Sequence, residues 1–277
     1  MSLPFLPVRR RHHVKKNLPT AAACVFLLCL CLTLISCTSQ STKSERQTEA
    51  PVAPQPALLF AGDSIMEGLG PVVAAMLPNQ GNLKIVQAGR SSTGLCRPDF
   101  YDWPKAMRTF MRAEHPKTVV ICIGTNDDQT VADAGVRHQF ISPRWQLAYR
   151  HKVEEIINII EEYGGASIWV SPPIMGPNAL RPRVFAIREV IRQTCEARNV
   201  PFIDIWPTLA DANGNFQYSL IAPGGKTITL RARDGVHIAP AGNKILAKAV
   251  LPHLENMLQT STPPDISTIA PEELPGQ

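Results

Sequence analysis

Four short polar segments, each of which follows an apolar run, contain residue types that can activate a hydroxyl group. The segments are Gly62-Asp63-Ser64-Ile65, Ala88-Gly89-Arg90-Ser91, Gly124-Thr125-Asn126-Asp127 and Asp234-Gly235-Val236-His237. A serine hydroxyl is a weak nucleophile unless a neighbouring base removes its proton. The chemistry that this set predicts is nucleophilic attack by Ser64, with His237 as the base.

The fourth segment is the most specific of the four. A spacing of three brings the side chains of Asp234 and His237 together across one turn, where a carboxylate fixes the imidazole tautomer and stabilises its protonated form. Of the seven histidines, only His237 has an acidic residue three positions before it. A histidine alone is usually structural, whereas one with an orienting acid favours a functional role.

The other three segments each have a structural alternative. Ser64 stands at a strand-to-helix turn, where backbone N–H groups favour negative charge, but Asp63 or Ser64 could equally cap the helix. Gly89 could present its N–H to a ligand or form a turn. The Asn126 amide could reach a developing oxyanion or serve as a cap.

The elements that must position these segments follow from the hydropathy pattern. Near-continuously apolar runs predict strands buried on both faces: Ala57–Ala61, Leu83–Gln87, Thr118–Ile123, Ala166–Ser171 and Pro201–Ile205. Longer segments predict helices: Met66–Met76, Trp103–Ala113, Trp145–Tyr163, Ala179–Arg198 and Pro240–Leu258. This alternation predicts a three-layer, doubly wound, flavodoxin-like α/β fold around a five-stranded parallel sheet, with ligands at the carboxyl ends of the strands.

The four segments, in this order, resemble the SGNH (GDSL-type) hydrolase superfamily. The resemblance implies a catalytic triad of Ser64, Asp234 and His237. It also implies an oxyanion hole formed by the backbone N–H groups of Ser64 and Gly89 and by the Asn126 amide. No metal or organic cofactor enters the implied mechanism.

The resemblance covers roughly residues 57–259. The segments Arg90–Leu95 and Arg97–Pro104 are similar to a poorly characterised branch of bacterial extracytoplasmic members. One departure is Ile65-Met66-Glu67, where many lipases have Leu or Tyr, and this argues against a lipase.

Two insertions are expected to shape the substrate site. One is Asp128–Pro143, and the other, Asn213–Arg233, predicts a small β-hairpin because Phe216–Ile221 and Thr227–Arg231 alternate around Pro223-Gly224-Gly225. Neither supplies the extended apolar lid that a lipase needs.

Several arginines could contact an anionic or hydroxyl-rich substrate, or could equally be solvated surface residues. They are Arg90, Arg97 and either Arg231 or Arg233.

Three functions of different classes remain open. The first is an esterase that removes short acyl groups, O-acetyl above all, from an envelope glycan. The second is an O-acyltransferase that works with a membrane-bound acyltransferase and passes the acyl group from Ser64 to a cell-surface polysaccharide. The third is a catalytically silent envelope binding protein.

The net charge of +5 does not predict a nucleic-acid partner. Five of the 28 basic residues lie within residues 1–36, which contain no acid, and the remaining 23 equal the 23 acidic residues. An apolar content of 44% is ample for a folded core.

The amino terminus predicts export and lipidation. A basic stretch, Arg9–Lys16, precedes the uncharged segment Ala21–Ile35, which is shorter than the ~20 residues of a spanning helix. Leu34-Ile35-Ser36-Cys37 then resembles the bacterial lipobox, in which the cysteine carries lipid; an uncleaved anchor is the alternative. Thr38 replaces the Asp typical of inner-membrane retention, so we expect an anchor on the periplasmic side of the outer membrane.

The expected layout is a signal peptide over residues 1–36, a Ser-, Thr- and Pro-rich tether over 37–56, the hydrolase domain over 57–259 and a disordered tail over 260–277. Three cysteines remain in the domain, Cys96, Cys122 and Cys195, and none is part of a CxxC motif. We expect free thiols, with a Cys96–Cys195 bridge as the open alternative.

Replacing the predicted lipidation site tests this layout. Because the lipid is attached to the sulfur of Cys37, the Cys37→Ala protein should lose incorporation of labelled palmitate, measured after expression in a bacterial host. The Cys31→Ala protein, altered within the predicted signal peptide, should keep it. Palmitate retained by Cys37→Ala would rule out the lipobox.

Overall fold

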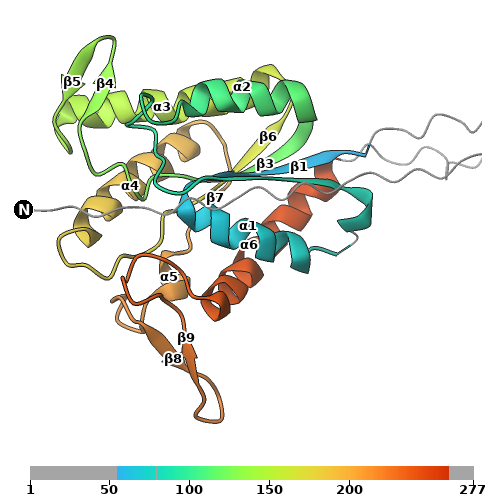
Figure 1. Cartoon of the computed structure of the whole chain (residues 1–277), viewed down its shortest axis with the longest axis vertical. Helices are drawn as coiled ribbons and strands as arrows, with labels where there is room; N and C mark the ends of the chain where they lie inside the picture. Colours follow the sequence, from blue (N-terminus) through green and yellow to red (C-terminus); the bar gives the residue numbers. More distant parts are fainter. Residues whose placement is uncertain (1–54, 79, 262–277) are drawn as a thin grey trace, which may run out of the picture. The chain divides into compact units, whose positions relative to one another are not determined.

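The computed structural model describes residues 55–78 and 80–261, which build a five-stranded parallel sheet (Figure 1). The strand order is β2-β1-β3-β6-β7. Their bounds are β1 Ala57–Gly62, β2 Lys84–Gly89, β3 Pro116–Cys122, β6 Ala166–Val170 and β7 Phe202–Ile203. The predicted signal peptide, Cys37 and nearly all of the tether and tail lie outside the described residues.

Helices cover both faces of the sheet, and this confirms the three-layer α/β prediction. One face packs against α2 Trp103–Glu114, α3 Pro143–Glu162 and α4 Arg181–Ala197. The other packs against α1 Ser64–Met76, the short α5 Trp206–Leu209 and α6 Pro240–Ser261. A short 3-10 helix, Gln80–Asn82, precedes β2.

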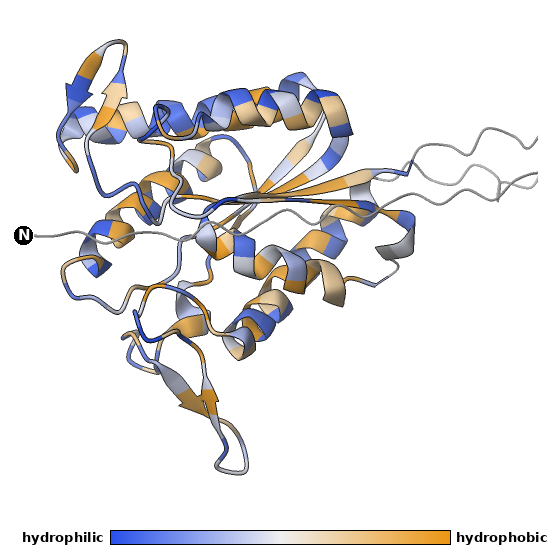
Figure 2. Ribbon diagram, viewed as in Figure 1, coloured by the Kyte–Doolittle hydropathy of each residue, from blue (hydrophilic) through white to orange (hydrophobic). Residues whose placement is uncertain are grey.

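The central strand β1 shows why its sequence is apolar throughout. All six of its residues are buried. Leu59 and Ala61 belong to the core beneath α2, α3 and α4, while Leu58 and Phe60 belong to the core beneath α1 and α6. An interior parallel strand has no solvent-facing side, so apolar residues are required at odd and even positions alike. The strands of the sheet are accordingly largely hydrophobic in Figure 2.

The edge strand β7 is shorter than the apolar run Pro201–Ile205 predicted. Only Phe202 and Ile203 pair with β6, through Trp169 and Val170. The chain then turns into α5 at Trp206, with the Asp204 carboxylate accepting the Trp206 N–H at 3.1 Å. The apolar run Pro201–Ile205 therefore indicates a buried segment correctly, but it overstates the number of residues that pair with β6.

Both insertions contain a hairpin. The predicted one pairs β8 Ser219–Ile221 with β9 Thr227–Thr229 and extends beyond the layers in Figure 1. The other insertion pairs β4 Val131–Asp133 with β5 Val136–His138, which the sequence did not predict. Its turn places Ala134 and Gly135 at positive φ, whereas the usual sequence signal for such a turn is Asn-Gly or Asp-Gly.

Two further predictions can be compared with the described residues. Helix α6 continues to Ser261, so the prediction that the tail begins at residue 260 is wrong by two residues. Cys96, Cys122 and Cys195 are buried free thiols, and no bridge joins Cys96 to Cys195.

Over residues 55–78 and 80–261, no helix is both long enough and apolar enough to cross a bilayer.

Candidate active site

The register of three neighbouring strands, β2, β1 and β3, brings their carboxyl ends to one level. Gly62 of β1 lies opposite Gly89 of β2 and Cys122 of β3. Backbone hydrogen bonds continue this alignment past the strand ends, from Asp63 N to Cys122 O at 3.0 Å and from Arg90 N to Gly62 O at 2.8 Å. The loops that carry Ser64, Gly89 and Asn126 therefore leave the sheet along one edge.

A hydrogen-bonded relay joins the start of the domain to its end at this edge. His237 Nε2 lies 3.0 Å from Ser64 Oγ, and His237 Nδ1 lies 2.7 Å from Asp234 Oδ2, although Ser64 and His237 are 173 residues apart in the chain. With Nδ1 donating to the carboxylate, Nε2 is left to accept the serine proton. The predicted triad residues thus meet at distances suited to proton transfer.

The loop between Asp234 and His237 holds the carboxylate in place. Asp234 Oδ1 accepts the N–H groups of Val236 at 2.8 Å and His237 at 3.0 Å. Partial burial raises the pKa of Asp234, but the hydrogen bonds from the His237 side chain and from the two N–H groups outweigh it and bring the pKa to about 2. The carboxylate is therefore ionised at any pH near neutrality.

The capping alternative for the first segment applies to Asp63 and not to Ser64. Asp63 is the N-cap of α1, and its Oδ1 accepts the Ile65 N–H at 2.9 Å. Ser64 is the first residue of the helix, so its hydroxyl faces His237 while its own N–H belongs to the first turn. This position combines an activated hydroxyl with the positive end of the helix dipole.

Gly89 and Asn126 lie close to the nucleophile loop. A Cβ on Gly89 would come within 2.4 Å of the Glu67 Cα, so only glycine permits the approach of β2 to α1. Asn126 Nδ2 donates one hydrogen bond to Thr93 O at 2.8 Å. An amide nitrogen has two hydrogens, which leaves a second one for an oxyanion.

Asp63 connects two of the strand-end loops from within the core. Its side chain is fully buried, and besides Ile65 it binds the Thr125 N–H through Oδ2 at 3.0 Å. The nucleophile is thereby fixed to the loop that carries Asn126. Burial raises the pKa of Asp63 from 3.8 to about 6, against the opposing effect of these hydrogen bonds.

Asp127 connects the loops after β2 and β3 in the same way. The buried carboxylate accepts the N–H groups of Leu95 at 2.9 Å and Cys96 at 2.8 Å, and the Tyr149 hydroxyl at 2.8 Å. A Cβ on Gly94 would lie 2.3 Å from its Oδ1. Asp63 and Asp127 lie inside the motifs that the sequence predicted. Their bridging role could not be predicted from residue spacing, because their partners include backbone N–H groups that are distant in the chain.

The arginines predicted to contact substrate have different environments. The Arg90 guanidinium lies over the Tyr101 ring, 4.6 Å from its centroid. Arg97 makes a two-pronged ion pair with Asp99, both side chains being exposed. Arg231 is only 2% exposed and binds backbone carbonyls inside the domain, so of the alternatives Arg231 and Arg233 the first is wrong, whereas Arg233 is exposed.

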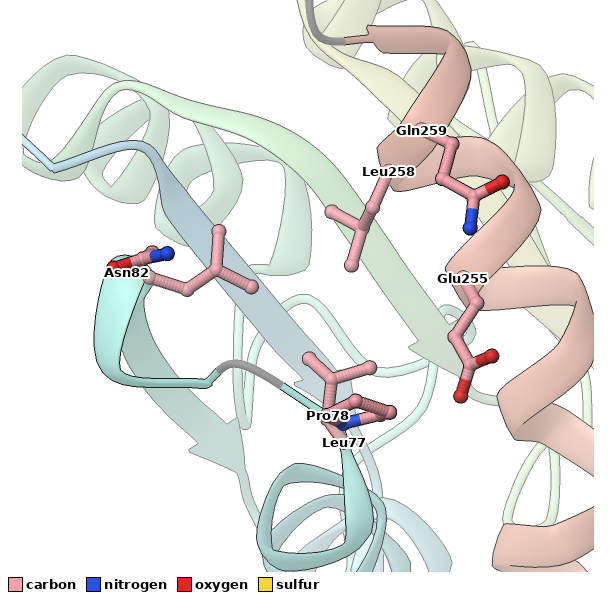
Figure 3. Close-up of a pocket in the computed structure, with 7 residues that line it drawn as sticks. Leu77, Pro78, Asn82, Glu255, Leu258 and Gln259 are labelled. Carbon is pink, nitrogen blue, oxygen red and sulfur yellow. The ribbon is translucent and has the colours of Figure 1, made fainter.

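A hollow of about 280 Å³ lies between the end of α1 and the last turns of α6 (Figure 3). Leu77, Pro78 and Leu83 form part of its lining, and β2 begins at the next residue, Lys84. The hollow therefore lies by the amino end of β2, whereas Ser64 and His237 lie by the carboxyl ends of the strands.

In the described part of the chain, no group of three or more His, Cys, Asp or Glu is arranged to hold a metal ion.

Solved structures share this arrangement of sheet and helices. A GDSL-like lipase from Bacteroides thetaiotaomicron is 17% identical, with a TM-score of 0.52 over 74% of this chain and 92% of that chain. The acetyl xylan esterase AlAXEase is 19% identical, with a TM-score of 0.53 over 72% and 99%. A carbohydrate acetylesterase family member from Sinorhizobium meliloti is 15% identical, with a TM-score of 0.52 over 74% and 99%.

These similarities show that the chain has the fold of a GDSL-like lipase and of acetylesterases. Residues 57–253 match the family described as "Protein of unknown function (DUF459)", and the chain belongs to this family. No curated protein sequence matches the chain.

The buried carboxyl of Asp63 predicts a pH-dependent stability. Because the folded protein holds this proton more tightly than the unfolded chain, the free energy of unfolding should fall by about 2 kcal/mol as the pH rises from about 4 to 6. The Asp63→Asn protein cannot titrate here and should lose this part of the pH dependence, measured by urea unfolding across that range. The Asp99→Asn protein, altered at an exposed carboxylate, should behave as wild type, and equal slopes for Asp63→Asn and wild type would contradict the assignment.

Proposed function

We propose that the domain is a serine esterase that removes short acyl groups, O-acetyl above all, from a glycan of the cell envelope. The observation that carries the proposal is the relay from Asp234 through His237 to Ser64, with hydrogen bonds of 2.7 and 3.0 Å. In this relay a base of suitable geometry lies within reach of a hydroxyl at a helix start, which is the arrangement that activates a serine.

In the first step, His237 Nε2 takes the Ser64 proton as Oγ forms a bond to the ester carbonyl carbon. The carbonyl oxygen becomes an oxyanion, which the N–H groups of Ser64 and Gly89 and the Asn126 amide receive. Donors of this kind each contribute roughly 2.7–4 kcal/mol to lowering the barrier. Asp234 balances the positive charge that His237 gains.

In the second step, the bond between the carbonyl carbon and the alcohol oxygen breaks, and the alcohol leaves with the proton from His237. The acyl group is then attached to Ser64 Oγ. Water loses a proton to His237, attacks this ester and releases the carboxylic acid, so that Ser64 regains its hydrogen. The sequence of steps consumes one water and one ester.

The openness of the site supports a short acyl group on a large carrier. The side chains of His237 and Asp234 are 49% and 47% exposed, so a polymer can approach the relay directly. Two of the structural relatives are named as an acetyl xylan esterase and a carbohydrate acetylesterase family member. Both names are consistent with O-acetyl groups on sugar rings as the substrate.

The amino-terminal sequence supports a location at the envelope. The basic stretch, the apolar segment and Leu34-Ile35-Ser36-Cys37 are together typical of an exported lipoprotein. We infer that Cys37 anchors the domain to the periplasmic side of the outer membrane, with the tether between them. A glycan of the envelope would then be within reach.

An O-acyltransferase is the second candidate, and the same exposure favours it. An acyl group on Ser64 beside a half-exposed His237 is accessible to a sugar hydroxyl as well as to water. A membrane-bound acyltransferase would then be the partner that supplies the acyl group. A silent binding protein has less support, because it has no need of the Asp234–His237–Ser64 relay.

Replacing the relay residues tests the esterase. The full chain, purified in detergent, should react with a fluorophosphonate probe and hydrolyse an aryl acetate, whereas Ser64→Ala should lose the labelling. Hydrolysis should fall roughly 10⁶-fold in Ser64→Ala and His237→Ala, and roughly 10⁴-fold in Asp234→Asn, which keeps the shape but not the charge. Labelling that persists in Ser64→Ala would refute the nucleophile, and Ser91→Ala is the matched control.

Competition between water and sugar separates the two candidates. With an acetyl donor and an added oligosaccharide, an esterase should release free acetate and leave the oligosaccharide unmodified, because water reaches the acyl-Ser64 first. Mass spectrometry of the sugar together with an acetate assay measures the partition. Acetylated oligosaccharide as the main product would replace the esterase with the transferase.

A further inference from the structure

A buried arginine lies directly behind the loop that carries the base and its acid. Arg231 Nη2 donates to Gly235 O at 3.1 Å and to Val236 O at 2.7 Å. These two residues are the ones that separate Asp234 from His237. The guanidinium therefore holds the two peptide groups whose orientation sets the directions of both functional side chains.

The charged side chain of Arg231 is buried, which is unusual for an arginine. The side chain is 2% exposed, and its Nε and Nη1 have no hydrogen-bond partner among the residues of the domain that the structure describes. The Phe216 ring lies 5.3 Å from its Cζ and covers part of the group. Burial lowers the pKa of Arg231 to about 10, so the group is a cation at neutral pH.

The carboxylate of the relay stabilises this cation electrostatically. The negative charge of Asp234 is the main effect that opposes the lowering of the Arg231 pKa by burial. Asp234 also binds the imidazole of His237. One carboxylate thus balances a permanent cation and a base that must become a cation during the reaction.

The loop around Arg231 is closed by further backbone hydrogen bonds. Ala232 N donates to His237 O at 2.9 Å, and Gly235 N donates to Ala232 O at 3.0 Å. From outside the loop, Gly176 N donates to Gly235 O at 2.8 Å. The structure therefore fixes the loop on several sides, and the side chain of Arg231 binds the carbonyls of both Gly235 and Val236.

We propose that Arg231 is a positioning residue, which holds the loop between Asp234 and His237 and thereby directs both side chains toward Ser64. This inference rests on the proposed serine esterase.

Other charged and titratable groups around the loop come from each element packed against it. Arg181 at the start of α4 donates to Met175 O at 2.7 Å and to Gly176 O at 2.8 Å. The Tyr218 hydroxyl approaches Gly235, as the space around that glycine shows. On the α1 side, the contact with His237 is the Ser64 hydroxyl, and Arg233 in the loop itself is exposed.

Two substitutions separate the charge of Arg231 from its hydrogen bonds. The Arg231→Met protein loses both, whereas Arg231→Lys keeps the charge but loses the planar guanidinium that reaches two carbonyls. Arg150→Met is the matched control, because it removes an exposed arginine of α3, outside this loop. Thermal unfolding of each full-length protein in detergent establishes that it is folded.

The first measurement does not depend on turnover. The proton on His237 Nδ1, which the Asp234 carboxylate accepts, is followed by NMR of isotope-labelled histidine, with His237→Ala to assign the signal. Its downfield, hydrogen-bonded shift should be lost in Arg231→Met and in Arg231→Lys, because the loop no longer directs the two side chains toward each other. It should stay unchanged in Arg150→Met, and an unchanged signal in a folded Arg231→Met protein would overturn the proposal.

The second measurement is the rate of aryl acetate hydrolysis. The kcat should fall at least tenfold in Arg231→Met and in Arg231→Lys, with little change in KM, because the loop no longer holds the base and its acid toward Ser64. A folded Arg231→Lys protein with wild-type kcat would overturn the positioning role. A wild-type protein that neither hydrolyses aryl acetates nor reacts with the fluorophosphonate would instead refute the esterase and leave the NMR result to stand alone.

Discussion

The hydrogen bond between His237 Nε2 and Ser64 Oγ is the interaction on which the site depends. It joins the first and last motifs of the domain, 173 residues apart, and it forms because α1 and α6 lie together on one face of the sheet. In a parallel sheet every strand ends at the same edge, so loops distant in the chain meet there. The relay is thus a consequence of topology, and local structure alone could not create it.

Buried carboxylates give this edge its rigidity. Asp63 binds N–H groups from α1 and from the loop after β3, and Asp127 binds N–H groups from the loop after β2. Burying an acid costs free energy, which is visible in the raised pKa of both groups. In return, the loops that carry Ser64, Gly89 and Asn126 are held relative to one another, and a fixed array of donors stabilises an oxyanion better than a mobile one.

The accessibility of the relay limits the kinds of substrate that fit. A lipase needs an apolar surface that covers the acyl chain, whereas the relay here is half exposed. Because the shared fold at 15–19% identity specifies only the scaffold, the substrate class must come from this site. The exposure of the relay is the feature on which we base the proposal of an acyl group on a large carrier.

Local sequence patterns predicted the five strands of the main sheet, the five long helices, the three-layer fold and the residues of the relay. Buried parallel strands and amphipathic helices have characteristic local patterns, and Asp234 lies one turn before His237. The tertiary structure alone decided that Asp63 caps α1 while Ser64 faces His237, that a hairpin forms over Val131–His138, and that Arg231 is buried behind the relay. Each of these depends on contacts between distant segments, which a local pattern does not encode.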